Sequence, residues 1–307
     1  MYMKKRVRSD LFLILCALLI WFLADAAQVR SSASKALVLC AGSVIPALFP
    51  FLVVSRLLVE LGFGQWASPL LSGLMTPLFR LPGSSGSAVL LGLVGGYPIG
   101  TQTAAGLYRT GQLTQEEAER LLTFCNNSNP VFLISVLGAG VFGSVQTGMW
   151  LWLIHILSAL LTGLLCGRSP AGYSVRHSAP PQISAPSAFA PAFVAAVRDS
   201  AAGMLSVCAF VVVFYVLAAP LQALSSPMAA LLTGLLELFS LTPLLKADAF
   251  SFVLAAVCAG WGGLSVLAQT AAVLDGTDLR LWPCIRGKAV QSLLSALLAW
   301  LTVPMLF

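Results

Sequence analysis

The chain has 307 residues, of which 58% are hydrophobic and only 9% are charged. A soluble domain usually carries about 25% charged residues, so this chain has too little polar surface to cover a core in water. The composition excludes an ordinary soluble protein and predicts an all-α integral membrane protein; the net charge of +6 is scattered and predicts no nucleic-acid partner.

The first segment, residues 1–35, is expected to hold a basic N-terminus and a first helix. Its basic residues precede the apolar run Leu11–Leu23, and they are Lys4, Lys5, Arg6 and Arg8. Lys and Arg beside a first helix mark the cytoplasmic side of a membrane. The same pattern fits a signal peptide, with Ala24–Ala26 as a small-residue cleavage site. We favour a retained helix, because the rest of the chain is itself apolar.

Six apolar runs approach the length of about 20 residues that a helix needs to cross the hydrocarbon. They are Leu11–Ala27, Ala36–Leu61, Cys125–Phe142, Met149–Cys166, Ser200–Leu224 and Ala289–Phe307. Together they predict a polytopic helical bundle with the lipid bilayer as its solvent.

Two shorter apolar runs end in glycine-rich breaks. Ala88–Val94 leads into Gly95, Gly96, Tyr97 and Pro98, and Phe250–Ala259 leads into a break that contains Gly262 and Gly263. Irregular backbone at membrane depth persists only where protein or a water-filled cavity satisfies its polar groups. Each break therefore predicts a re-entrant hairpin.

The segment 168–198 differs from its surroundings because it is rich in proline and serine, which is typical of a linker. Its arginines place it in the cytoplasm. It would separate a first repeat, 36–167, from a second repeat, 199–307. The tetrad Gln102–Ala105 recurs as Gln269–Ala272, which supports a duplication.

The predicted spans also set the orientation of the two repeats. Three full spans lie between the starts of the repeats, and an odd number inverts the second repeat relative to the first. Inverted repeats with broken helices are typical of transporters, whose sites lie near the bilayer midplane. This topology places Arg280, Arg286 and Lys288 outside, against the usual preference of basic residues for the cytoplasmic side.

Polar side chains next to the breaks are the candidate substrate-binding residues. Amides and hydroxyls offer both donors and acceptors, which suits an unknown small, neutral, polar solute such as a nucleobase or a sugar. The candidates are Gln102, Thr103, Asn126, Asn127, Ser128, Gln269 and Thr270. The alternatives are a polar interhelical loop for the asparagines and small-residue helix packing for the two Gln-Thr pairs.

Local patterns around these residues predict how the helices begin. Thr114 and Glu117 form a Thr-x-x-Glu capping box, so a short helix is expected from Gln115, at the cytoplasmic surface. Asn129 before Pro130 is expected to be the N-cap of the next span.

Ionisable residues within apolar runs are further candidates. Glu237 is the candidate for ion or proton coupling; the alternative is an interfacial helix whose acid faces water. Arg56 and Glu60 have the i, i+4 spacing of a helical ion pair, but they lie near the cytoplasmic end of their run, so we favour side chains that snorkel to the interface. His155 is expected to bond a neighbouring helix. No enzyme signature or metal-ligand pattern occurs, so we expect no catalytic residue, metal or cofactor.

These motifs together resemble a known family. Gly95–Gly100, Arg109–Thr114 and Asn126–Pro130 resemble bacterial sporulation integral membrane proteins that carry a nucleoside-recognition, or Gate, domain, and Gly262–Ser265 with Gln269 fits the second half of that family. The resemblance implies a multi-pass protein of the bacterial cytoplasmic membrane that is needed for endospore formation.

The name of the Gate domain reflects a similarity to concentrative nucleoside transporters, which carry a Gly-Gln-Thr-Glu pattern in a re-entrant hairpin. Here Ala104 and Ala271 stand at the glutamate position. The missing carboxylate removes an acceptor for ribose hydroxyls, which argues against a nucleoside as the solute.

Two functions follow as expectations. The first is a transporter-like sporulation protein that moves a small polar solute or an envelope precursor. The second is a non-transporting membrane scaffold that docks sporulation or envelope partners, or a further copy of itself as a homo-oligomer.

Overall fold

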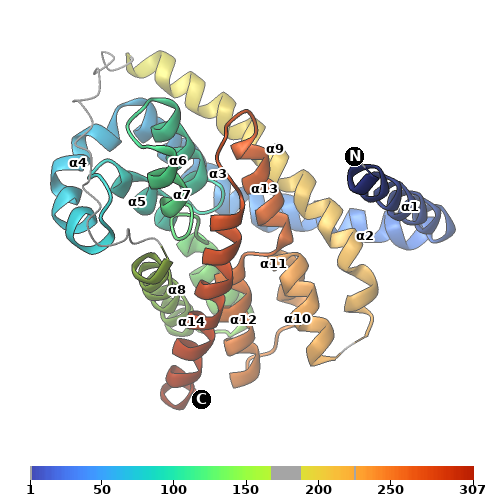
Figure 1. The fold of residues 1–307 in the computed structure, drawn as a ribbon. Coiled ribbons are helices and arrows are strands. Elements are labelled where there is room, and N and C mark those ends of the chain that lie inside the picture. The colour runs from blue at the N-terminus through green and yellow to red at the C-terminus, as the bar shows by residue number, and fades with distance from the viewer. Residues whose placement is uncertain (1, 167–187, 225) are drawn as a thin grey trace.

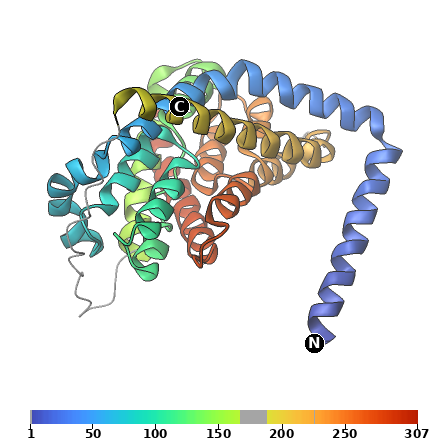
Figure 2. The ribbon, with the colours of Figure 1, turned by 90° about the horizontal axis from the view of Figure 1, so that it is seen from above.

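The computed structural model describes residues 2–166, 188–224 and 226–307, and these residues form helices and connecting turns without a β-strand. Figure 1 shows a bundle in which α8, α12 and α14 lie together near the C-terminus, while α1 stands apart from the body in Figure 2. The expected all-helical class is therefore confirmed.

The helices of the first half, with two π-helical turns and one longer π-helical segment, are α1 (Tyr2–Ala24), α2 (Ala26–Leu39), Cys40–Val44, α3 (Ile45–Glu60), α4 (Phe63–Leu74), Met75–Phe79, α5 (Ser85–Gly95), α6 (Ile99–Arg109), α7 (Gln115–Leu121), Phe132–Val141 and α8 (Val145–Cys166). Those of the second half, with one 3-10 turn, are α9 (Phe189–Gln222), α10 (Pro227–Leu236), α11 (Leu238–Leu241), Thr242–Leu244, α12 (Ala249–Trp261), α13 (Leu264–Leu274) and α14 (Trp282–Leu306).

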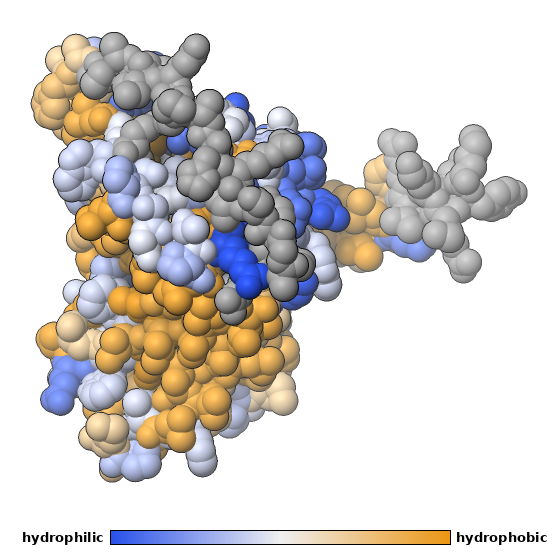
Figure 3. All heavy atoms as spheres, turned by 60° about the vertical axis from the view of Figure 1, so that its left-hand side comes forward, coloured by the Kyte–Doolittle hydropathy of each residue, from blue (hydrophilic) through white to orange (hydrophobic). Residues whose placement is uncertain are grey.

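Five helical stretches of the described chain are long and apolar enough to cross a membrane: Ala26–Glu60, Val145–Cys166, Phe189–Gln222, Ala249–Leu274 and Trp282–Leu306. Large apolar side chains such as Leu205, Leu293 and Trp300 are exposed on them. Figure 3 shows apolar residues covering the lower part of one face and hydrophilic residues gathered above them. This surface is the one that a lipid bilayer covers, so the chain is an integral membrane protein.

Two of the expected spans differ in the structure. Cys125–Phe142 is not one helix: residues 126–129 have no regular secondary structure, helix resumes at Pro130, which suits a first turn because it has no N–H to donate, and the helix is π-helical from Phe132. The last helix begins at Trp282 rather than Ala289, so Lys288 lies inside α14. It is buried there rather than standing in a loop before the last helix, as the expected start at Ala289 implied.

The two glycine-rich breaks also differ from each other. α5 and α6 fold back and pack along one another, with Gly92 so close to Gly100 that an added Cβ would lie 3.1 Å from the Gly100 Cα. α12 and α13 instead follow each other within one interrupted span and do not pack side by side. The expected hairpin at Gly262 and Gly263 is therefore an interruption of a crossing helix.

The helices that carry the two Gln-Thr pairs run in the same direction. The start of α6 meets the end of α12, where the Tyr97 hydroxyl donates to the Ala259 carbonyl at 2.8 Å. The end of α6 meets the end of α13, where Arg109 Nη2 donates to the Val273 carbonyl at 3.2 Å. Because α6 and α13 are parallel, the tetrads Gln102–Ala105 and Gln269–Ala272 are not inverted copies of each other. If the chain contains an inverted repeat, other segments form its matching parts.

Three further features differ from expectation: the bounds of the linker, the burial of helix α7, and the end of the bundle at which Arg286 lies. The linker 168–198 falls mostly on 167–187, outside the described residues, and its last residues belong to α9 from Phe189. Helix α7 is buried against α5, α6, α8 and α14 rather than lying on the surface. Arg286 Nη2 donates to the Cys166 carbonyl at 3.4 Å, so the start of α14 shares one end of the bundle with the end of α8. Placing Arg286 opposite the linker was therefore wrong.

Candidate functional site

Four interruptions of the helical backbone meet inside the bundle. They are the turn 96–98 between α5 and α6, the unwound segment 126–129, residue Glu237 between α10 and α11, and the pair Gly262–Gly263 between α12 and α13. Gly96 lies against Asn129, Tyr97 against Gly262, and Gly263 against Glu237. The breaks therefore converge on one junction, although they come from both halves of the chain.

Two glycines allow this approach. Gly96 has φ +83°, and an added Cβ would lie 2.6 Å from the Asn129 Cβ. Gly263 has φ +93°, and its Cβ would lie 3.1 Å from the Leu236 carbonyl oxygen. Other residues rarely adopt this backbone conformation, and here any side chain would also push neighbouring segments apart.

A small central cavity lies at this junction, with a volume of about 20 Å³. Such a volume holds about one water molecule and no larger solute. Its polar lining consists of Tyr97, Ser128, Asn129, Glu237, Ser265 and Gln269. Of the predicted binding residues, Ser128 and Gln269 therefore lie here, together with the coupling candidate Glu237.

Glu237 is buried, with 2% of its surface exposed, so the alternative of a water-facing interfacial acid is wrong. Its carboxylate caps α11 by accepting the backbone N–H of Phe239 at 3.0 Å and of Ser240 at 2.5 Å. The Ser240 hydroxyl donates a further bond at 2.8 Å. These donors stabilise a carboxylate at a helix N-terminus, which explains how an acid is held in this position.

The other predicted amides form a buried polar network beside the cavity. Asn126 Nδ2 donates to Thr270 Oγ1 at 3.0 Å, which joins the unwound segment to α13. Gln291 Nε2 donates to Asn127 Oδ1 at 3.0 Å, and Lys288 Nζ donates to Gln291 Oε1 at 2.9 Å, which joins the same segment to α14. These residues position the unwound backbone.

A larger, outer cavity of about 480 Å³ lies on the other side of the α5–α6 turn, where Pro98 borders it. Gln102 and Thr103 line this cavity, so the two Gln-Thr pairs do not share one cavity. Arg56 and Asp199 form its opposite wall through an ion pair of 3.3 Å. Arg56 also forms the ion pair with Glu60 that their i, i+4 spacing allows, at 3.7 Å.

Both cavities follow the same two helices. Leu52 of α3 and Gly203 of α9 line the outer cavity. Leu48, one turn before Leu52, and Val207, one turn after Gly203, line the central cavity. The two cavities are therefore arranged in series, with the α5–α6 turn between them.

Two local predictions are confirmed, and His155 bonds the non-helical segment 126–129 rather than a neighbouring helix. Thr114 accepts the Glu117 N–H at 3.2 Å and the Thr114 N–H donates back to the Glu117 carboxylate at 2.9 Å, which is a complete capping box. The Phe132 N–H donates to Asn129 Oδ1 at 2.8 Å, as an N-cap requires. His155 is buried, and its Nε2 accepts the Ser128 N–H at 3.0 Å.

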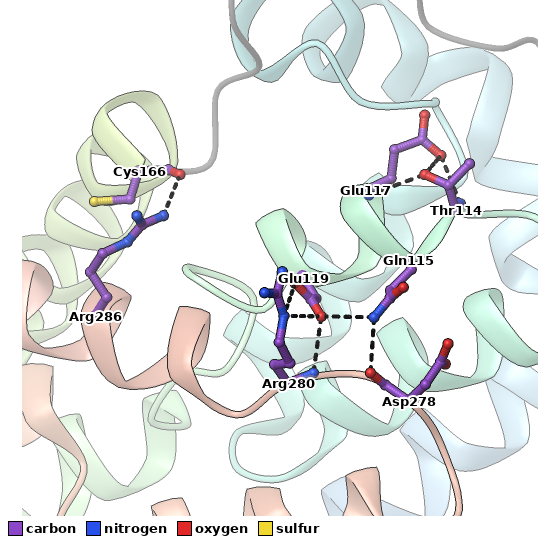
Figure 4. Close-up of polar contacts among 8 residues, drawn as sticks. All are labelled: Thr114, Gln115, Glu117, Glu119, Cys166, Asp278, Arg280 and Arg286. Atoms are coloured by element: carbon purple, nitrogen blue, oxygen red, sulfur yellow. Dashed lines mark hydrogen bonds and ion pairs between the residues drawn. The ribbon is translucent and has the colours of Figure 1, made fainter.

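At the charged end, Glu119 of α7 binds the loop before α14 (Figure 4). Arg280 Nη2 and Nε donate to the Glu119 carboxylate at 2.6 and 3.0 Å, and the Arg280 N–H donates at 3.0 Å. Burial alone would raise the pKa of this carboxyl, but the Arg280 bonds outweigh burial and hold the pKa below its ordinary value. Gln115 adds a bond from the same helix to the Asp278 carbonyl, at 2.9 Å.

Lys288 and Gln291 are site residues that the sequence analysis missed. The two lie three positions apart on one helix face, and both are fully buried. The signal was the Lys-x-x-Gln spacing itself, which was hidden because the last span was expected to begin after Lys288.

The fold and the junction define a polytopic membrane protein whose interrupted helices meet around a polar centre. Residues 41–147 match the family model described as Gate, nucleoside recognition. The chain is 30% identical over 304 residues to sporulation integral membrane protein YlbJ of Bacillus subtilis (strain 168), a match that covers 84% of this chain and 73% of the relative. The chain belongs to this family of sporulation integral membrane proteins. No solved structure matches it significantly.

Proposed function

We propose that this protein is a carrier, without enzymatic activity, that moves a small, neutral, polar solute across the bacterial cytoplasmic membrane. The observation that carries the proposal is the convergence of four backbone breaks on one polar cavity in a membrane protein. Exposed peptide groups at membrane depth are costly, and broken-helix transporters use them to line the solute site near the midplane.

The arrangement of the breaks supports two inverted halves with a new correspondence. The α5–α6 hairpin would match the segment from α10 to Leu245, and the interrupted segment 122–141 would match α12–α13. The flanking pairs α3 with α9 and α8 with α14 pack against each other. Repeats of this kind move against each other in alternating access.

The two cavities give this movement a direction. The outer cavity would admit solute from the charged end of the bundle, which the positive-inside preference places in the cytoplasm. The central cavity is much smaller, and the α5–α6 turn separates the two. In this proposal the hairpin tip, with Tyr97 and Pro98, is the gate between them.

The charges of the outer cavity suit a neutral solute. Arg56 and Arg109 are offset by Glu60 and Asp199, so the wall carries no net charge. Gln102 and Thr103 of the same cavity then offer donors and acceptors for hydroxyl, amide or ring-nitrogen groups.

The test is ligand-induced stabilisation of the purified full-length protein. A panel of nucleobases, sugars and other neutral polar solutes is screened by thermal melting; a solute at 100 times its Kd stabilises a protein by about 2.7 kcal/mol. We expect Gln102→Ala, in the wall of the outer cavity, to abolish the shift, whereas Gln146→Ala, at an exposed position on α8, keeps it.

The opposite results would support the scaffold instead. They are the absence of a shift with every solute, and normal sporulation of strains that carry Gln269→Ala or Asn127→Ala. Uptake by proteoliposomes then decides between binding and transport for any solute that shifts the melting temperature.

A further inference from the structure

Lys288 is a buried cation with no acidic partner. Only 1% of its surface is exposed, and within the described ranges no carboxylate forms an ion pair with it. Its hydrogen-bond acceptor is the neutral Gln291 side chain, at 2.9 Å. An isolated charge in such a place is costly, and in a membrane protein it marks function more often than packing.

The ammonium lies where the first hairpin and the unwound segment meet. Its Nζ is 5.0 Å from the centre of the Tyr97 ring, at the tip of the α5–α6 hairpin. Through Gln291 it holds Asn127 of the unwound segment. α14 reaches this place because Gly287 packs directly on the backbone of Thr123; an added Cβ would lie 2.0 Å from the Thr123 carbonyl oxygen.

The surroundings of Lys288 suit a positive charge. α5 and α12 both end at the junction, and helix C-termini carry partial negative charge. The Tyr97 ring presents an electron-rich face. The titratable groups that face the ammonium are Tyr97, Cys125, Cys284 and His155, none of which is a carboxylic acid. In broken-helix carriers, such backbone and helix-end groups bind the cation that couples solute binding to closure.

We propose that the ammonium of Lys288 is a built-in cation that holds the α5–α6 hairpin against the unwound segment, in the position that a bound coupling cation would otherwise occupy. This inference rests on the proposed carrier function. It implies that closure of the hairpin tip in this protein is independent of sodium.

The test is hydrogen–deuterium exchange of residues 96–101 in the purified full-length protein without solute, in sodium chloride and in choline chloride of equal ionic strength. The wild type is expected to show equal protection in both salts. Lys288→Ala is expected to exchange about tenfold faster in choline, because a cation–π contact and a charged hydrogen bond are lost. Sodium should restore part of its protection, and Lys288→Arg should stay close to the wild type.

Two further comparisons keep the test decisive. Arg286→Ala removes a charge two positions away and should leave the tip unchanged. If Lys288→Ala does not fold, Tyr97→Leu, which removes the ring, should loosen the tip, while Tyr97→Phe keeps the ring face and should loosen it less.

Three results would overturn the inference: sodium-dependent protection of the wild type, unchanged exchange in Lys288→Ala, or loosening that sodium does not reverse. The measurement uses no solute, so its failure is distinguishable from a failure of the carrier proposal. Conversely, a negative solute screen does not alter the exchange result.

Discussion

Gly96 shows at the scale of one residue why the junction needs particular amino acids. It combines a positive φ of 83° with direct contact to the Asn129 side chain. A methyl group there must both strain the backbone and displace the unwound segment.

We therefore expect Gly96→Ala to lower the stability of the protein by about 2 kcal/mol or more, since both effects add. Thermal melting of the purified protein measures the change. Gly106→Ala is the control: it lies within α6 with no atom within 4 Å of the added Cβ, so it should be neutral or slightly stabilising. Equal melting temperatures for the two variants would contradict the close approach at the hairpin tip.

Glu237 illustrates what residue type alone leaves open. The sequence shows an acid in an apolar run, which fits either a buried coupling site or an interfacial helix whose acid faces water. In the structure, Glu237 is a buried carboxylate that caps α11, because the folded chain brings the Phe239 and Ser240 N–H groups to it. Its proposed part in coupling stays a prediction.

At the scale of elements, one ion pair supplies the charged part of the link between α7 and the loop before α14. Glu119 is buried and accepts from both the side chain and the backbone of Arg280. Its pKa is lowered in the folded protein, so this contribution to stability is complete above the ordinary glutamate pKa of about 4.3 and is lost as the pH falls through the lower folded-state pKa.

We expect Arg280→Ala to melt at a lower temperature than the wild type at pH 7. The difference should shrink on acidification below about pH 4.3, because protonated Glu119 no longer favours Arg280. Arg286→Ala, which loses only a 3.4 Å bond to the Cys166 carbonyl, is the control and should show no such pH dependence. A constant difference down to low pH would mean that packing, not charge, joins the two elements.

Helix boundaries were predictable where a local motif sets them. The capping box at Thr114 and the N-cap Asn129 lie where the sequence predicts them, because a cap depends on residues within one turn. The fold-back of α5 on α6 and the continuation of α12 into α13 were not distinguishable, since both breaks are short and rich in glycine. Neighbouring helices decide that difference.

At the scale of the whole molecule, the end of α6 at Arg109 and the loop that carries Asp275, Asp278 and Arg280 gather at one end of the bundle. The end of α13 is tied to Arg109, and the start of α14 to the end of α8. The span Ala249–Leu274 separates this end from Lys246.

We therefore expect membrane-impermeant maleimide to label Lys246→Cys in intact cells, above the background of the native cysteines. Arg280→Cys should be labelled only after the cells are permeabilised, because the positive-inside preference places its end in the cytoplasm. Labelling of both positions from one side would contradict the crossing of α12–α13, and the reverse pattern would turn the proposed outer cavity towards the outside.

The sequence by itself determined that this is an integral membrane protein, that glycine-rich breaks interrupt its helices, and that its motifs resemble the Gate family. These properties follow from composition and from short patterns, which need no knowledge of neighbours. Only the tertiary structure decided that four breaks meet at one junction, that α6 and α13 are parallel, and that Lys288 lies inside. Each of these depends on contacts between segments more than 100 positions apart, where side-chain packing sets direction and depth.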